Sequence, residues 1–202
     1  MAGRYHSVMF TPPVLEAQRR FQRRSAVVTP QMAPDPLTPD EIDFIGQRDS
    51  FYLGTVSPTG WPYIQHRGGP PGFLRVLDPQ RLAFADYTGN RQMITTGHVA
   101  NDDRVSLFLM DYPQRQRLKI IGHARVLDAR EHPDLVESLA DPATRRITER
   151  LVLIDVVSYD WNCPKYITPR YTATEVEAAV AGLRARIREL EKTLAERQNG
   201  AG

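Results

Sequence analysis

Cysteine is nearly absent from this chain of 202 residues, which carries only Cys163. A single cysteine excludes an intramolecular disulfide and fits a reducing compartment. No apolar run approaches the roughly 18 residues of a membrane-spanning helix. The first 20 residues contain two prolines and lack the continuous apolar core of a secretory signal. We therefore expect a cytoplasmic protein that does not associate with a membrane.

Signatures of common catalytic and metal sites are also missing. The five histidines show neither HxH nor HExxH spacing, so no metal site is predicted. There is no GxGxxG after a strand, no GxxxxGK[ST] sequence and no serine-centred nucleophile elbow. These absences argue against the usual dinucleotide, P-loop and serine-hydrolase sites, and no catalytic residue can be assigned from sequence.

Lysine is scarce as well, with 3 lysines against 23 arginines. The net charge of +2 is small and the basic residues are spread along the chain, which argues against a nucleic-acid partner. Because arginine is so common here, a lone arginine is weak evidence of a site. The pairs Arg19-Arg20 and Arg23-Arg24 are interpreted as a solvated face rather than a binding site.

Apolar patterning predicts a mainly β (α+β) fold. Short helices are expected at 14–24, 38–48, 90–99, 131–140 and 142–150, and the one at Thr38 has a capping box closed by Glu41. Closely spaced strands with few long helices are typical of an antiparallel barrel with peripheral helices. The seven strands expected are 50–57, 61–67, 72–77, 80–86, 104–110, 117–127 and 151–159.

Three parts are predicted along the chain. Residues 1–36 form an N-terminal arm, 37–170 the barrel, and 171–202 a helix and tail. The helix has an apolar seam spaced 4, 3, 4, 3, 4, which is a heptad pattern. It could pack on its own barrel or on a partner chain, and a narrow seam favours a partner. The seam residues are Val176, Val180, Leu183, Ile187, Leu190 and Leu194.

Two glycine-marked turns are the best local candidates for a ligand site. The expected strand at 61–67 ends in His66-Arg67 and a glycine turn that begins at Gly68. Arginine offers a rigid fork of donors to phosphate, and glycine lets backbone N–H groups approach a ligand. A second turn, residues 89–92, stands at the N-terminus of the helix expected at 90–99, where the helix dipole and backbone donors could bind phosphate. The alternatives are an ordinary strand end and a plain turn.

Two further clusters are candidates with competing interpretations. Arg117, Lys119 and His123 alternate along one strand, so they share a sheet face that meets either an anion or water. The segment after the last strand, Trp161 to Tyr166, could close over a planar ring, or Trp161 could plug the barrel end. A reactive Cys163 would need a depressed pKa, and a buried or ligand-contacting cysteine is favoured over a catalytic thiol.

Taken in order, several motifs resemble the pyridoxamine 5′-phosphate oxidase superfamily, the FMN-binding split barrels. HRGG…GF at 66–73, a GN turn at 89–90 and WNCP at 161–164 are similar to its subgroup of predicted flavin-nucleotide-binding proteins. The other matching motifs are GWPY at 60–63, FAD at 84–86, NRQ at 90–92, NDDRVSL at 101–107 and RLKIIGHA at 117–124.

The resemblance implies an antiparallel split β-barrel that forms a homodimer, with two FMN sites at the subunit interface. It implies that Gln65, His66 and Arg67 line the flavin beside Gly68, and that Asn90, Arg91 and Gln92 meet its phosphate. It also places Arg117 at a polar contact to the cofactor and Trp161 near the ring, with Cys163 in the same loop.

Some family motifs are replaced. The Arg-x-Val strand and the Ser-Arg-Lys turn of true pyridoxamine phosphate oxidases are absent, and their C-terminal Arg-x-His segment has no counterpart. Oxidation of pyridoxamine phosphate is therefore not expected, whereas flavin binding survives these changes. The favoured function is an FMN-dependent oxidoreductase acting on an unidentified small molecule. The alternatives are a split barrel that binds deazaflavin or haem, and a non-catalytic dimeric flavin-binding module.

Overall fold

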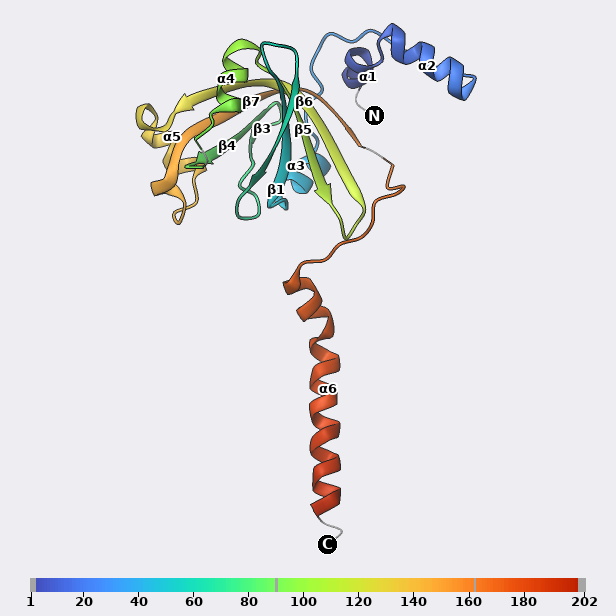
Figure 1. The fold of residues 1–202 in the computed structure, drawn as a ribbon, viewed down its shortest axis with the longest axis vertical. Helices are drawn as coiled ribbons and strands as arrows, with labels where there is room; N and C mark the ends of the chain where they lie inside the picture. Colours follow the sequence, from blue (N-terminus) through green and yellow to red (C-terminus); the bar gives the residue numbers. More distant parts are fainter. Residues whose placement is uncertain (1–2, 90, 162, 200–202) are drawn as a thin grey trace.

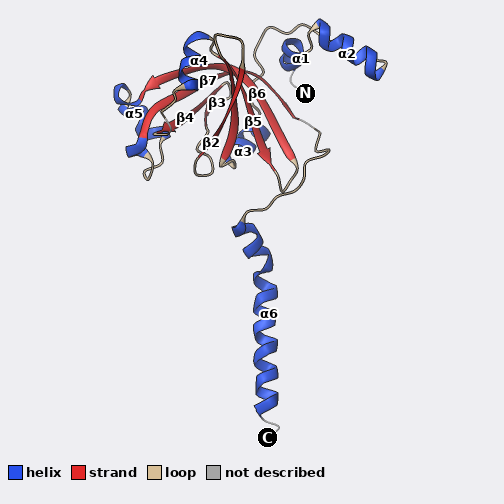
Figure 2. Cartoon of the chain, in the orientation of Figure 1, coloured by secondary structure: helices blue, strands red, loops and turns tan. Residues whose placement is uncertain are grey.

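A single antiparallel sheet dominates the computed structural model, which describes residues 3–89, 91–161 and 163–199. Its strands are drawn red in Figure 2. The order across the sheet is β2-β1-β5-β6-β7-β4-β3. The bounds are β1 Ser50–Val56, β2 Pro62–Gly68, β3 Arg75–Asp78, β4 Arg81–Tyr87, β5 Arg104–Asp111, β6 Gln116–Asp128 and β7 Thr148–Trp161.

The sheet curls until its two edges approach each other, as Figure 1 shows. Strands β1 and β4 are far apart in the sheet order, yet the rings of Phe51 and Phe84 lie 5.3 Å apart, centroid to centroid. Phe73 stacks on Phe51 at 5.5 Å and completes the group. All neighbouring strands run antiparallel. The expected antiparallel split barrel of seven strands is therefore confirmed.

Alternation along the strands explains where the core lies. In β5 the buried positions Val105, Leu107 and Leu109 alternate with more exposed ones, as a sheet with one covered face requires. Leu118 and Ile120 of β6 lie in the same core, fully buried. Burial of each such side chain contributes about 1.5–3 kcal/mol relative to exposure, so the pattern fixes which face turns inward.

Helices α1, α3, α4 and α5 lie around this sheet, whereas α2 buries no residue and points away from it (Figure 1). Helix α3 begins with the expected capping box, in which Thr38 and Glu41 satisfy each other's backbone N–H groups. Helix α6 extends away from the barrel in Figure 1. The helix bounds are α1 Gly3–Met9, α2 Pro12–Gln22, α3 Pro39–Gly46, α4 Ile94–Asn101, α5 Pro133–Leu139 and α6 Ala173–Asn199. None of the described helices is both long enough and apolar enough to cross a membrane.

Several predicted boundaries were wrong. The helix expected at 142–150 is replaced by a short 3-10 turn at Arg145–Ile147, after which β7 begins at Thr148. The reason is tertiary, because residues 148–155 pair with β4 and this pairing outweighs local helix propensity. The helix expected at 90–99 is α4, which starts four residues later, and the strand expected at 72–77 is the shorter β3.

The N-terminal arm contains a helix that the sequence did not reveal. Helix α1 precedes α2, and its Tyr5 is buried against the sheet. The Lys119 ammonium lies 4.8 Å from the centre of the Tyr5 ring, a cation–π contact. The helix expected at 14–24 is found as α2, shifted by two residues. The first part of the arm therefore packs on the barrel.

One glycine is required where β6 meets β7. The register of these strands shifts between Ile121 and Gly122, which marks a bulge. A Cβ atom on Gly122 would lie 2.5 Å from the carbonyl oxygen of Asp155, closer than real contacts allow. The glycine therefore permits the close approach of the two backbones.

Candidate functional site

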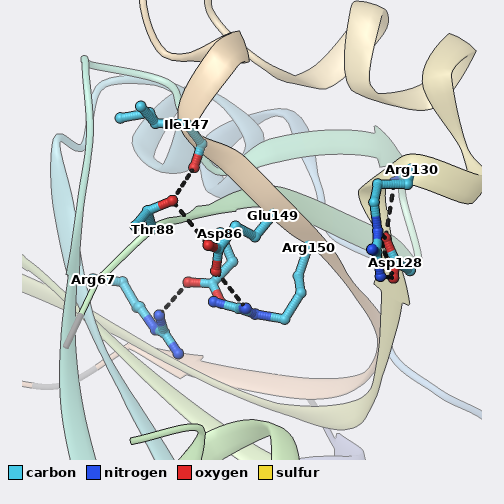
Figure 3. A network of polar contacts seen from close by, with 8 residues as sticks. All are labelled: Arg67, Asp86, Thr88, Asp128, Arg130, Ile147, Glu149 and Arg150. Carbon is cyan, nitrogen blue, oxygen red and sulfur yellow. Dashed lines mark hydrogen bonds and ion pairs between the residues drawn. The ribbon is translucent and has the colours of Figure 1, made fainter. Parts of the chain in front are cut away.

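A polar pocket lies where the two edges of the curled sheet meet. Arg67 on β2 and Asp86 on β4 form an ion pair that bridges the split between these strands. The other oxygen of Asp86 accepts a hydrogen bond from Arg150 Nε at 2.9 Å. Figure 3 shows Asp86 lying between the two arginines. Because Asp86 and Arg150 are also register partners in β4 and β7, the sheet itself positions this pair.

All three side chains are largely buried, with 15% of Arg67, 8% of Asp86 and 16% of Arg150 exposed. Burial would lower the pKa of Arg150, but the hydrogen bond and the charge of Asp86 outweigh it and raise that pKa. Arg67 Nε is buried and has no hydrogen-bond partner among the described residues. One buried donor of this arginine is thus left for another group to satisfy.

A second layer fixes the start of β7 beside this pair. The Thr88 hydroxyl lies 3.2 Å from the Ile147 carbonyl and 3.0 Å from a Glu149 carboxylate oxygen (Figure 3). Glu149 also accepts from Arg150 at 2.8 Å. The hydrogen bond from Arg150, then that from Thr88, lowers the pKa of Glu149, and Arg91 adds a smaller electrostatic effect. Arg91 therefore interacts electrostatically with Glu149, the carboxylate that is paired with Arg150.

The loop before α4 forms the opposite wall of the pocket. Arg91 and Met93 have positive φ angles of 59° and 54°, an uncommon conformation for residues with side chains. The Thr95 hydroxyl donates to the Gln65 side-chain oxygen at 2.8 Å, which ties α4 to β2. The cavity between these parts has a volume of about 170 Å³. Its polar lining includes Gln65, Arg67, Asp86, Arg91, Gln92, Thr95 and Arg150.

The structure brings together one part of the predicted site. Gln65, Arg67, Arg91 and Gln92 all line this cavity. The prediction for Asn90 lies outside the described residues. Which of these residues touch a cofactor stays a prediction.

His66 and Gly68 are placed elsewhere. His66 lies on the opposite face of β2 from Gln65 and Arg67, since alternate residues of a strand point to opposite faces. Its ring packs edge-on against Tyr52 at 5.7 Å. Gly68 pairs with Ser50 at the end of the strand. Neither residue lines the cavity bordered by Arg67, Arg91 and Arg150, which we call the arginine pocket.

The remaining predicted residues lie at the other end of β7. Trp161 pairs with Leu118, next to Arg117, and Cys163 follows as an exposed thiol. Trp161 follows Arg150 by eleven positions, which is roughly 35 Å along an extended strand. Within one chain, these residues and the arginine pocket therefore do not form a single site.

Trp161 holds α3 against the end of the barrel. Its indole Nε1 donates to the Glu41 carboxylate at 2.5 Å, and its ring meets Phe44 edge-on at 4.8 Å. Burial would raise the pKa of Glu41, but hydrogen bonds from Thr38 and Trp161 outweigh it and lower that pKa. Burial, and next the Glu41 charge, raises the pKa of Tyr159 to about 12. Of the two interpretations of Trp161, this contact supports a packing role at the barrel end.

Two residues of the alternating face of β6 are already paired, whereas Arg117 Nε is buried and has no hydrogen-bond partner among the described residues. Lys119 binds Asp160 at 2.7 Å and also covers Tyr5. His123 Nδ1 lies 2.8 Å from an Asp103 oxygen. These contacts occupy Lys119 and His123 with carboxylates of the chain itself. Within the described residues, no group of three or more His, Cys, Asp or Glu side chains is arranged to hold a metal ion.

Sequence reasoning missed Asp86 and Arg150, the centre of the network. The signal for Asp86 was an acid within an otherwise apolar stretch, because buried carboxylates need partners. Arg150 carried no such signal, since residues 142–150 were expected to be helical. Its role depends on β7 pairing with β4.

Comparisons with known proteins bear on the fold around this pocket. Residues 37–160 match the family model described as pyridoxamine 5′-phosphate oxidase. No curated protein sequence matched the chain.

Solved structures similar to the chain include the following three. HupZ of Group A Streptococcus is 12% identical over 67% of this chain and 99% of its own, with a TM-score of 0.48. General stress protein 26 of Bacillus anthracis is 15% identical over 60% and 91%, with a TM-score of 0.46. A conserved hypothetical protein of Mycobacterium tuberculosis is 17% identical over 72% and 97%, with a TM-score of 0.48.

Proposed function

The chain belongs to the pyridoxamine 5′-phosphate oxidase family, and from this premise we propose that it is an FMN-dependent oxidoreductase acting on a small molecule. The arginine pocket would hold the phosphate of the cofactor. The observation that carries the proposal is the buried Arg67 Nε without a partner, in a cavity that Arg91 also lines. An arginine fork with an unsatisfied donor suits a phosphate oxygen.

The charges of the pocket fit a bound anion. Arg67, Arg91 and Arg150 face two carboxylates, Asp86 and Glu149, which leaves one net positive charge. Asp86 already occupies one nitrogen of Arg67 and one of Arg150. A phosphate would therefore approach from the side of Arg91 and Gln92, away from the Asp86 carboxylate, because like charges repel.

The chain's own residues position and balance charge in this proposal. Asp86 keeps Arg67 and Arg150 fixed before any ligand arrives, which reduces the entropic cost of binding. The Thr95–Gln65 hydrogen bond holds the first turn of α4 against β2. The flavin, when bound, supplies the hydride or electron chemistry, and the protein supplies position and electrostatics.

The proposal includes a homodimer with the cofactor at the interface. Its support is the separation of the predicted residues along β7, described above. A cofactor that meets both the arginine pocket and Arg117, which lies near the other end of β7, needs the second group from another chain. Deleting residues 173–199 and measuring mass by light scattering tests whether the barrels associate without α6.

Absorbance of the purified protein, before and after FMN addition and desalting, is the direct test. Retained bands at about 450 nm and 370 nm, at one flavin per chain, would support the proposal. A retained band at about 420 nm would indicate that the protein binds deazaflavin instead of FMN, or haem if the band is sharp and intense. No retained chromophore would overturn the proposed FMN-dependent enzyme and favour a non-catalytic binding module without flavin.

A matched pair of variants then tests the pocket. Arg91→Ala should weaken FMN binding by more than about tenfold, since a charged hydrogen bond contributes about 1.5–3 kcal/mol. Arg75→Ala removes the same charge from an exposed position on β3 and should leave the affinity unchanged. Equal affinity for FMN in the wild type and both variants would show that Arg91 does not bind the phosphate.

A further inference from the structure

Helix α6 carries an apolar seam that the described part of the chain leaves largely exposed. It runs for 27 residues and extends away from the barrel in Figure 1. Along the seam the exposed fractions are 67% for Leu183, 54% for Ile187 and 58% for Leu194. Apolar side chains aligned in this way are costly to leave in water, so the seam requires a partner.

The residue types along the seam select the geometry of the partner. In heptad notation Val180, Ile187 and Leu194 take position a, and Val176, Leu183 and Leu190 take position d. The two complete heptads, 180–193, therefore have a β-branched residue at a and leucine at d. β-branched residues at a with leucine at d favour parallel two-stranded coiled coils. We propose that α6 pairs with the α6 of a second copy of this chain as a parallel, in-register coiled coil.

The charges beside the seam favour the same arrangement. Arg186 occupies position g and Glu191 the following position e, which face each other across a parallel dimer. By symmetry this attraction occurs twice. No like charges meet at the other parallel pairs within 177–193, where Ala179 faces Arg184.

The antiparallel alternative is opposed by the same residues. In the register that keeps all six seam residues in contact, Val176 would face Leu194 and Leu183 would face Ile187. Glu177 would then lie opposite Glu191, while Arg184 and Arg186 would each meet their own copy. Like charges at these positions are destabilising.

The inference does not rest on FMN binding, but it draws on the association of the barrels that the proposed function includes. A helix of about three heptads is marginal when isolated, but tethering to barrels that also associate would raise its effective concentration. The seam would then hold two chains side by side with both barrels at the same end.

Disulfide trapping in the full-length chain tests the arrangement. In a Cys163→Ser background, Leu190→Cys places a thiol at position d, where the two copies meet in the parallel register. Oxidation should give a covalent dimer. Lys192→Cys in the same background is the control, because position f points away from the seam and should not crosslink.

Charge variants in the Leu190→Cys background test the register. Arg186→Glu or Glu191→Arg turns two attractive pairs into two repulsive ones, so the disulfide equilibrium against glutathione should fall by about tenfold. The double exchange should restore it. Arg186→Ala is included because Arg186 also pairs with Glu189 within the helix, at 2.5 Å.

The crosslinking results distinguish the parallel coiled coil, the antiparallel arrangement and the absence of pairing through this seam. Crosslinking of Leu190→Cys alone, with rescue by the double exchange, supports the parallel coiled coil. Crosslinking only of a Val180→Cys and Leu190→Cys double variant would assign the antiparallel arrangement. No crosslink in either, or equal crosslinking of Lys192→Cys, would overturn the pairing of two copies through this seam.

Discussion

At each end of β7 a carboxylate is shared by donors from other parts of the chain, but one of these networks borders a cavity and the other is packed against a helix. At its start, Arg150 shares the carboxylate of Asp86 with Arg67, and the three groups border a cavity. At its end, the carboxylate of Glu41 is shared by Thr38 and Trp161 within a packed contact to α3. One end concentrates positive charge beside an opening, and the other uses its polar groups to fasten a helix.

The two ends differ in whether an unsatisfied donor borders the cavity. Arg117 Nε, near Trp161, is also buried without a partner among the described residues, but Arg117 does not line the cavity that Arg67 borders. Glu41 is paired by donors from within the chain, and the Trp161 indole has its acceptor. At the other end, Arg67 Nε remains without a partner within the part of the chain described. A buried donor left over in a cavity is typical of a ligand site, whereas a closed network is typical of structural packing.

Removing the shared carboxylate at the start of β7 should have the largest effect on stability. Asp86→Asn leaves Arg67 buried without a charged partner and leaves Arg150 with Glu149 alone, and should lower the free energy of unfolding by about 3 kcal/mol. Chemical denaturation measures this change. Added phosphate should recover more stability in the variant than in the wild type, because it can replace the lost anion.

The control is the pair Asp128–Arg130, which appears separately in Figure 3. Arg130 is 88% exposed, so Asp128→Asn should change the stability much less than Asp86→Asn. Similar losses in the two variants would mean that the pocket network is no more than a surface ion pair.

We call the contact of Trp161 with Glu41 and Phe44 at the end of β7 the clasp. Breaking the clasp should lower the free energy of unfolding by less than Asp86→Asn does. Trp161→Phe keeps an aromatic ring beside Phe44 but removes the donor to Glu41, and should lower the free energy of unfolding by about 2 kcal/mol. Thermal denaturation measures it. Trp61→Phe, at a position that is 75% exposed, is the control and should be neutral. A neutral Trp161→Phe would refute the clasp.

Acid should weaken the clasp through Glu41. Its pKa in the folded protein lies below the ordinary value of 4.5, so its stabilisation is present above that value and is lost as the pH falls through the folded-state pKa. Glu41→Gln should therefore show a smaller loss of stability between pH 7 and pH 4 than the wild type. An identical acid profile in the two proteins would contradict this.

The smallest effect is expected on the outer face of β2. His66→Ala should leave FMN affinity unchanged, because His66 points away from the cavity that Gln65 and Arg67 line. Gln65→Ala should weaken binding about threefold by releasing Thr95 and the start of α4. Isothermal titration distinguishes the two, and a stronger effect of His66→Ala would show that the outer face takes part.

Much of the architecture could be predicted from sequence. The seven strands and the α3 capping box follow from local pattern, because alternation and capping depend on neighbouring residues. Arg67 and Arg91 were also found locally, as basic residues beside glycine turns. The start of β7 could not be predicted, because Thr148 to Arg150 become strand by pairing with distant residues of β4 and, at Arg150, of β6.

The sequence alone determined the strand alternation, the heptad seam of α6 and the absence of disulfide pairing, since each depends on residue type and spacing along one segment. Only the tertiary structure decided that Asp86 joins Arg67 to Arg150, and that Trp161 binds Glu41 at the far end of the barrel. Those partners lie far apart in the chain, and the curl of the sheet brings them together.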